Sequence, residues 1–138
     1  MELLEKILAS TLNSHPLTHS RLKHLSSRAQ CTEDIISRVG LALSIRRGPV
    51  PIEWVPKPIE GEDLERLAIK EKLLKGKTLF KDELALWMAL ILRNQVPEGY
   101  PSWRKVIISH WERGIEELSE ISDREGDWVR TVESCLSN

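Results

Sequence analysis

The chain has 138 residues and a formal net charge of -1, with 41% apolar but only 5% aromatic residues. This length suits one domain, residues 1–138, and apolar residues recur at helical spacing, so we expect an all-α fold of about six helices. The longest apolar run, 84–92, is about half of what a membrane span requires, and the acidic N-terminus differs from a secretory signal. We therefore expect a cytoplasmic protein without a membrane segment.

The first helix is predicted at residues 2–12. The His15-Pro16 pair that follows prevents its continuation, because the residue before proline avoids the helical region. A two-helix unit follows at 17–47. Leu22 and Leu25 form the apolar seam of its first helix, and Thr32 stands where the N-cap of the second helix belongs. Ile35, Ile36 and Leu43 are expected on the buried side of that second helix, with the sequence arginine, arginine, glycine, proline as its stop.

A proline-rich stretch at 48–61 separates this unit from the helical remainder, 62–138. Its four prolines exclude a regular helix and favour an extended strap over the core, with an edge strand at 52–55 as a weaker possibility. Its apolar residues are too many for a free linker. Of the five tryptophans, only Trp54 in this strap is expected to be exposed.

Four segments follow the strap. Residues 62–75 are predicted to form a helix that Gly76 ends, and 82–93 a helix that is apolar around most of its circumference and therefore central. After a turn, 101–121 is predicted to be a long helix with one apolar seam and one solvated acidic side. A last helix is expected at 123–136.

The two-helix unit resembles a known family. The runs that carry the resemblance are Arg21-Leu22-Lys23-x-Leu25-x-x-Arg28 and Thr32-x-x-Ile35-Ile36-x-Arg38-x-x-x-x-Leu43-Ser44. They are similar to the N-terminal half of DndE, the small DNA sulfur modification protein of bacterial phosphorothioation systems, and the resemblance covers roughly residues 17–94. The chain departs from the family pattern in two places. Residues 29–31 read Ala-Gln-Cys at the corner, and Lys81 replaces a glycine after Thr78-Leu79-Phe80.

The resemblance implies a non-catalytic subunit that assembles as a tetramer, binds nicked duplex DNA and works with the other subunits of a sulfur modification complex. The charge pattern agrees, since 21–47 holds six basic and two acidic residues and 66–81 holds six basic and one acidic residue. We expect the two clusters to lie side by side and exposed, while Arg38 makes a structural ion pair. The predicted DNA-binding residues are Arg21, Lys23, Arg28, Arg46, Arg47, Lys70, Lys72, Lys75, Lys77 and Lys81.

The sequence contains no glycine-rich phosphate loop, nucleophile elbow or cysteine–histidine pair, and we expect no catalysis, metal or cofactor. The acids of 112–123 could form a metal-dependent nuclease site, but a solvated helix face accounts for them more simply. The spacing of His19 and His24 does not suit a metal on one helix face, and His110 is expected at the edge of the core. Cys31 and Cys135 are expected to remain reduced.

Two alternative roles stay open. The protein could be a helical adaptor that binds protein partners through the apolar helix around Trp87 and its acidic C-terminal half, without DNA. Its tryptophans could also stack on exposed bases, although Trp87, Trp103, Trp111 and Trp128 all lie on apolar seams, which favours burial in the core or in a subunit interface.

Overall fold

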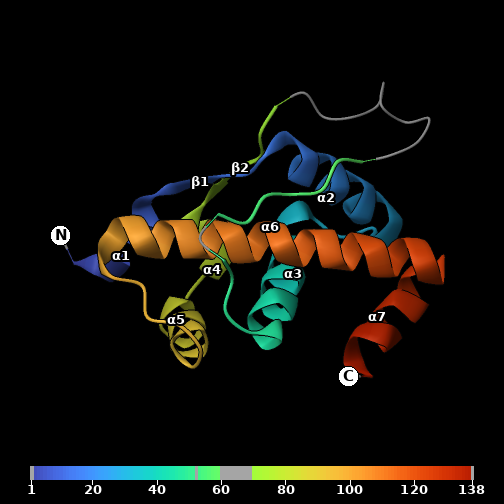
Figure 1. Ribbon diagram of the computed structural model, residues 1–138. Helices are drawn as coiled ribbons and strands as arrows, with labels where there is room; N and C mark the ends of the chain where they lie inside the picture. Colours follow the sequence, from blue (N-terminus) through green and yellow to red (C-terminus); the bar gives the residue numbers. More distant parts are fainter. Residues whose placement is uncertain (1, 52, 60–69, 138) are drawn as a thin grey trace.

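The computed structural model describes residues 2–51, 53–59 and 70–137 (Figure 1). Helices dominate this part of the chain, which confirms the predicted all-α class, and its one sheet has two short strands. None of the described helices is both long and apolar enough to cross a bilayer. In chain order, the elements are α1 (Leu3–Ala9), β1 (Thr11–Asn13), α2 (Pro16–Ala29), α3 (Glu33–Arg47), β2 (Leu73–Lys75), α4 (Gly76–Phe80), α5 (Leu84–Leu92), α6 (Gly99–Glu125) and α7 (Trp128–Leu136).

Helix α6 is the central element, and the other helices gather around it (Figure 1). Its Trp111, Ile115 and Leu118 are fully buried, and α3 crosses it at a point where both helices have glycine. A Cβ atom on Gly114 would lie 1.7 Å from the carbonyl oxygen of Gly40, so no larger residue fits there without separating the helices. The two backbones therefore touch directly.

Helix α3 starts at the predicted N-cap, Thr32, and ends before Gly48, as predicted. Ile36 and Leu43 are buried as expected, whereas Ile35 is 43% exposed. The difference arises because Ile36 is close to the α6 crossing and Ile35 faces the opposite side.

The sheet corrects two helix predictions. Residues 62–69 of the helix predicted at 62–75 lie outside the described residues, but Leu73–Lys75 is a strand, antiparallel to β1, with Leu74 opposite Leu12. The helix predicted at 2–12 likewise ends at Ala9. Gly76 is a packing residue and not a helix stop, because a Cβ atom there would lie 2.0 Å from the carbonyl oxygen of Ile7. Pairing between distant segments has overridden local helix propensity.

Helix α5 has the predicted position, but the prediction that it is central is wrong. It lies at the edge of the molecule (Figure 1), and only Leu84, Met88 and Ile91 are buried. Leu86 is 56% exposed and Leu92 46% exposed. The apolar composition of α5 therefore does not mean that the helix is buried within one chain.

Residues 48–51 and 53–59 follow an extended path across α6, as predicted for the strap (Figure 1). The amide of Val50 donates to Gln95 Oε1 at 2.9 Å, and the amide of Lys57 donates to Glu116 Oε1 at 2.7 Å. Of the edge strand predicted at 52–55, residue 52 lies outside the described residues and 53–55 are not a strand. Trp54 is half-buried against the core, which corrects its expected exposure.

Helix α6 is longer than predicted and continues to Glu125, where Gly126 ends it with a φ of 85°. The last helix consequently begins at Trp128 and not at 123. The Asp127 side chain caps it by accepting a hydrogen bond from the amide of Arg130 at 2.9 Å.

Candidate nucleic-acid interface

Arg21, the first predicted DNA contact, is used inside the fold. Its Nη1 lies 3.3 Å from Glu116 Oε1, and its Nη2 donates to the carbonyl of Lys57 at 2.6 Å. Its side chain is 10% exposed, and burial lowers the pKa of Arg21 although the charge of Glu116 opposes this. Arg21 fastens the strap to α2 and α6, so its guanidinium is not available to a phosphate.

Arg28 is also held internally. Its Nη1 donates to both the carbonyl and the hydroxyl of Ser122, each at 2.8 Å, and lies 3.9 Å from Asp123. The cation thereby ties α2 to the last turns of α6, where exposed carbonyl groups favour positive charge. Arg38 makes the ion pair predicted for it, 3.5 Å from Asp34 on the preceding turn.

Arg46 and Lys72 each make one internal contact but remain accessible to different degrees. Arg46 is exposed, and its Nη1 donates to the carbonyl of Cys135 at 2.8 Å, which leaves its other N–H groups free. The Nζ of Lys72 lies 3.1 Å from Glu33 Oε1, and its side chain is only 25% exposed. Arg46 is thus the better anion ligand of the two.

Six of the predicted DNA-binding residues are exposed, and their side chains form no hydrogen bond or ion pair within 4.0 Å in the described part of the chain. Three of them lie within Lys75–Lys81, a segment without an acidic residue that we call the lysine segment. The charge of Lys81 helps to lower the pKa of Asp34, although a hydrogen bond from Thr32 is the larger cause. The six are Lys23, Arg47, Lys70, Lys75, Lys77 and Lys81.

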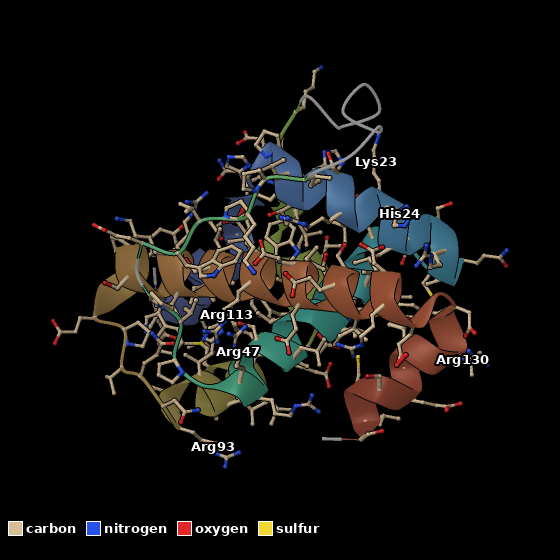
Figure 2. All side chains as sticks on the ribbon, turned by 45° about the vertical axis from the view of Figure 1, so that its right-hand side comes forward. Lys23, His24, Arg47, Arg93, Arg113 and Arg130 are labelled. Atoms are coloured by element: carbon tan, nitrogen blue, oxygen red, sulfur yellow. The ribbon has the colours of Figure 1, made fainter. Side chains whose placement is uncertain are left out.

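The structure does not bring the two predicted clusters together as one face. Lys81 is near Asp34 at the start of α3, whereas Arg46 and Arg47 lie at its end. At 1.5 Å per residue, these ends are about 20 Å apart. Lys23 lies on α2 at the edge of the molecule opposite Arg93 (Figure 2).

Sequence reasoning missed Lys6, Arg93 and Lys105, which are also exposed and without a partner among the described residues. In the sequence, Arg93 is only the last residue of a predicted helix. The structure shows that it borders a hollow of about 380 Å³ between α3 and α5, together with a tryptophan and a second arginine. The hollow is lined by Ala42, Ile45, Arg46, Trp87, Leu90, Arg93 and Asn94.

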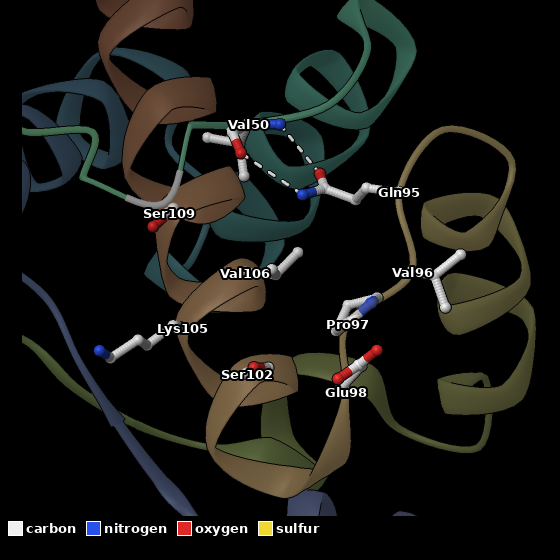
Figure 3. Close-up of a pocket in the computed structure, with 9 residues that line it drawn as sticks. All are labelled: Val50, Gln95, Val96, Pro97, Glu98, Ser102, Lys105, Val106 and Ser109. Carbon is white, nitrogen blue, oxygen red and sulfur yellow. Dashed lines mark hydrogen bonds between the residues drawn. The ribbon is translucent and has the colours of Figure 1, made fainter.

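A second hollow, of about 390 Å³, lies where the strap meets α6 (Figure 3). Gln95 forms two hydrogen bonds across its rim, accepting from the amide of Val50 and donating to its carbonyl. The remaining polar groups are mixed, because Lys105 and Glu98 carry opposite charges. This hollow therefore offers no clear preference for an anion.

The acidic side predicted for α6 is partly wrong. Glu112 is buried, and its Oε2 accepts from the amide of His15 at 2.7 Å and from the hydroxyl of Thr18 at 3.0 Å. Burial raises the pKa of Glu112 despite these bonds. Glu116 is buried in its bonds to Arg21 and Lys57, so these carboxylates are structural and not a solvated face.

The histidines and cysteines have separate surroundings. His15 caps α2 by accepting from the amide of Leu17, and His110 is 1% exposed between Ser44 and Gln95. No group of three or more histidine, cysteine or acidic side chains in the described ranges is placed to hold a metal ion. Both cysteines are free thiols.

A scan against protein-family models, a search of curated proteins and a search of solved structures each gave no match.

Proposed function

We propose that the protein is a non-catalytic DNA-binding subunit of a bacterial phosphorothioate modification system, as its resemblance to the DndE family suggests. The observation that supports this proposal most is the lysine segment. Lys75, Lys77 and Lys81 are exposed there and form no hydrogen bond or ion pair within 4.0 Å with a described side chain, although the charge of Lys81 acts on Asp34, and no acid separates them in the sequence. The proposal locates the protein in the cytoplasm, together with the DNA that it would bind.

The chemistry of this segment suits the DNA backbone. A lysine ammonium group is a compact charge that meets a phosphate without reading a base, and the release of condensed counterions supplies the affinity. The rest of one copy carries a balancing negative charge, since the whole chain has a net charge of -1. A homotetramer, also proposed from the resemblance, would repeat the lysine segment and strengthen the attraction.

Fluorescence anisotropy with labelled duplex DNA tests this proposal. We expect Lys75→Glu combined with Lys77→Glu to weaken binding of nicked duplex at least tenfold at low salt. A matched control replaces Lys105 on α6 and Arg130 on α7 by glutamate. It lowers the net charge by the same amount as the lysine-segment variant but leaves that segment unchanged. Equal losses in both variants would show that only total charge matters and would remove the lysine segment from the site.

A helical adaptor that binds protein partners without DNA is the second candidate, and the exposed side of α5 favours it. The nine residues of α5 include no charge, and Leu86, Leu92 and the following Val96 are 56%, 46% and 73% exposed. Apolar side chains in such a row are typical of surfaces that a partner covers. Light scattering with and without nicked duplex distinguishes the candidates, because an adaptor's mass would not change on adding DNA.

A further inference from the structure

The hollow between α3 and α5 combines cations with an aromatic wall, and none of its described lining residues is acidic. Arg46 comes from the last turn of α3, and Arg93 directly follows α5. Trp87 lies on the α5 side of the same hollow, one turn from Leu90. We refer to this site as the arginine–tryptophan hollow.

Its two arginines have hydrogen-bonding capacity to spare. A guanidinium has five N–H groups, of which Arg46 uses one on the Cys135 carbonyl, while Arg93 has no partner among the described residues. The planar arrangement of these donors matches the oxygens of a phosphate.

More positive charge lies close to the hollow. Arg47 is exposed beside Arg113, and its charge adds to burial in lowering the pKa of Arg113 (Figure 2). Arg113 itself donates to the carbonyls of Ser44, Gly48 and Pro49 and forms no ion pair within 4.0 Å in the described structure. Arg46, Arg47 and Arg113 thus place three cations at the end of α3, and Glu117 is the carboxylate whose charge acts on Arg113 there.

The apolar part of the hollow suits a flat ring. Trp87 is half-buried, and Ile45 and Leu90 line the same space. The indole Nε1 of Trp87 is buried without a hydrogen-bond partner in the described part of the chain, so packing alone holds the ring. An aromatic surface of this kind stacks on a nucleobase without sequence preference.

We propose that the arginine–tryptophan hollow receives one unstacked nucleotide at the nick of a duplex, with its phosphate on Arg46 and Arg93 and its base against Trp87. This inference rests on the proposed DNA-binding function and adds the site that distinguishes a nick. The lysine segment contacts phosphates that intact and nicked duplexes share. A strand end can leave the stack at lower cost than a base inside a continuous strand, because its backbone is already broken.

The size of the hollow agrees with a single nucleotide. Its volume of about 380 Å³ falls within the range of sites for small ligands, roughly 300–1,000 Å³.

The test compares affinities for a nicked duplex and for an intact duplex of the same sequence, measured by anisotropy on the full chain. We expect the wild type to prefer the nicked duplex by roughly fivefold to a hundredfold, the range that one stacked base supplies. Arg93→Ala and Trp87→Leu should each bring this ratio close to one. The control Arg130→Ala, on α7, should keep the wild-type ratio.

The Arg93 variant is the safer of the two, because this side chain is exposed and makes no hydrogen bond or ion pair with a described residue, so we expect its replacement to leave the fold intact. If the wild type binds neither duplex, the proposed function fails. If it binds both but the ratio survives in Arg93→Ala and Trp87→Leu, the hollow is not the nick site although DNA binding stands. A polyglutamate peptide that binds in the hollow and is not displaced by nicked DNA would also overturn the inference, in favour of an acidic protein segment.

Discussion

His110 allows a prediction about stability that follows directly from its surroundings. Its Nδ1 lies 2.8 Å from the hydroxyl of Ser44, and its Nε2 lies 3.1 Å from Gln95 Oε1. The amide oxygen of Gln95 can only accept, so Nε2 carries the proton and Nδ1 accepts from Ser44. Burial, followed by the charge of Arg113, lowers the pKa of His110 from 6.5 to about 4.

This difference determines the sign and size of a pH effect. Between about pH 6.5 and pH 4, His110 is protonated in the unfolded chain but stays neutral in the folded chain. The neutral imidazole thus contributes stability above pH 6.5, and this contribution is lost as the pH falls toward 4. At 1.36 kcal/mol per pKa unit, the full loss is about 3 kcal/mol.

Urea denaturation at a series of pH values between 7.5 and 4.5 measures this loss. We expect the unfolding free energy of His110→Gln to fall less steeply than that of the wild type, by up to about 1.4 kcal/mol per pH unit. The exposed His24 provides the matched control, and His24→Gln should keep the wild-type slope. Parallel slopes for wild type and His110→Gln would refute the reasoning, because other titrating groups such as Glu112 are present in both.

Four further substitutions test the packing. Gly114→Ala should cost about 3 kcal/mol in urea denaturation, because it forces α3 from α6, whereas Gly126→Ala meets no atom within 4 Å and should cost about 1 kcal/mol for its positive φ. Glu116→Ala should cost about 3 kcal/mol by leaving a buried guanidinium without its carboxylate, and limited proteolysis should then cut the strap faster. Leu86→Ser should change the unfolding free energy by less than about 0.5 kcal/mol, because this side chain is exposed, and a large loss of thermal stability would contradict that placement.

The main helices are predictable from the sequence because each carries its own periodic seam and stop signals. Thr32 and Gly48 locate the ends of α3, and the seam from Trp103 to Leu118 locates α6. The two strands could not be found in this way, since each has three residues and its partner is about 60 positions distant along the chain. Composition wrongly predicts that α5 is central. The sequence of an apolar helix does not distinguish a face that the same chain covers from one that stays exposed on that chain.

The candidate site was predicted less well, for a related reason. Arg21 and Arg28 look free in the sequence, but their partners on α6 are more than 90 residues away. Lys75 and Lys77 remain free because no acid among the residues that the structure describes lies within ion-pair distance of them. The arginine–tryptophan hollow arises only where α3 meets α5, so spacing within either helix gives no signal for it.

The salt dependence of binding to a nicked duplex tests the proposed DNA-binding role most directly. Anisotropy titrations between 50 and 200 mM salt should give a log-log slope of roughly -5, which corresponds to about half a dozen phosphate contacts. Replacing Lys75 and Lys77 by glutamate should make the slope shallower. No binding at 50 mM salt, or a wild-type slope close to zero, would contradict the assignment of this protein as a backbone-directed DNA-binding subunit.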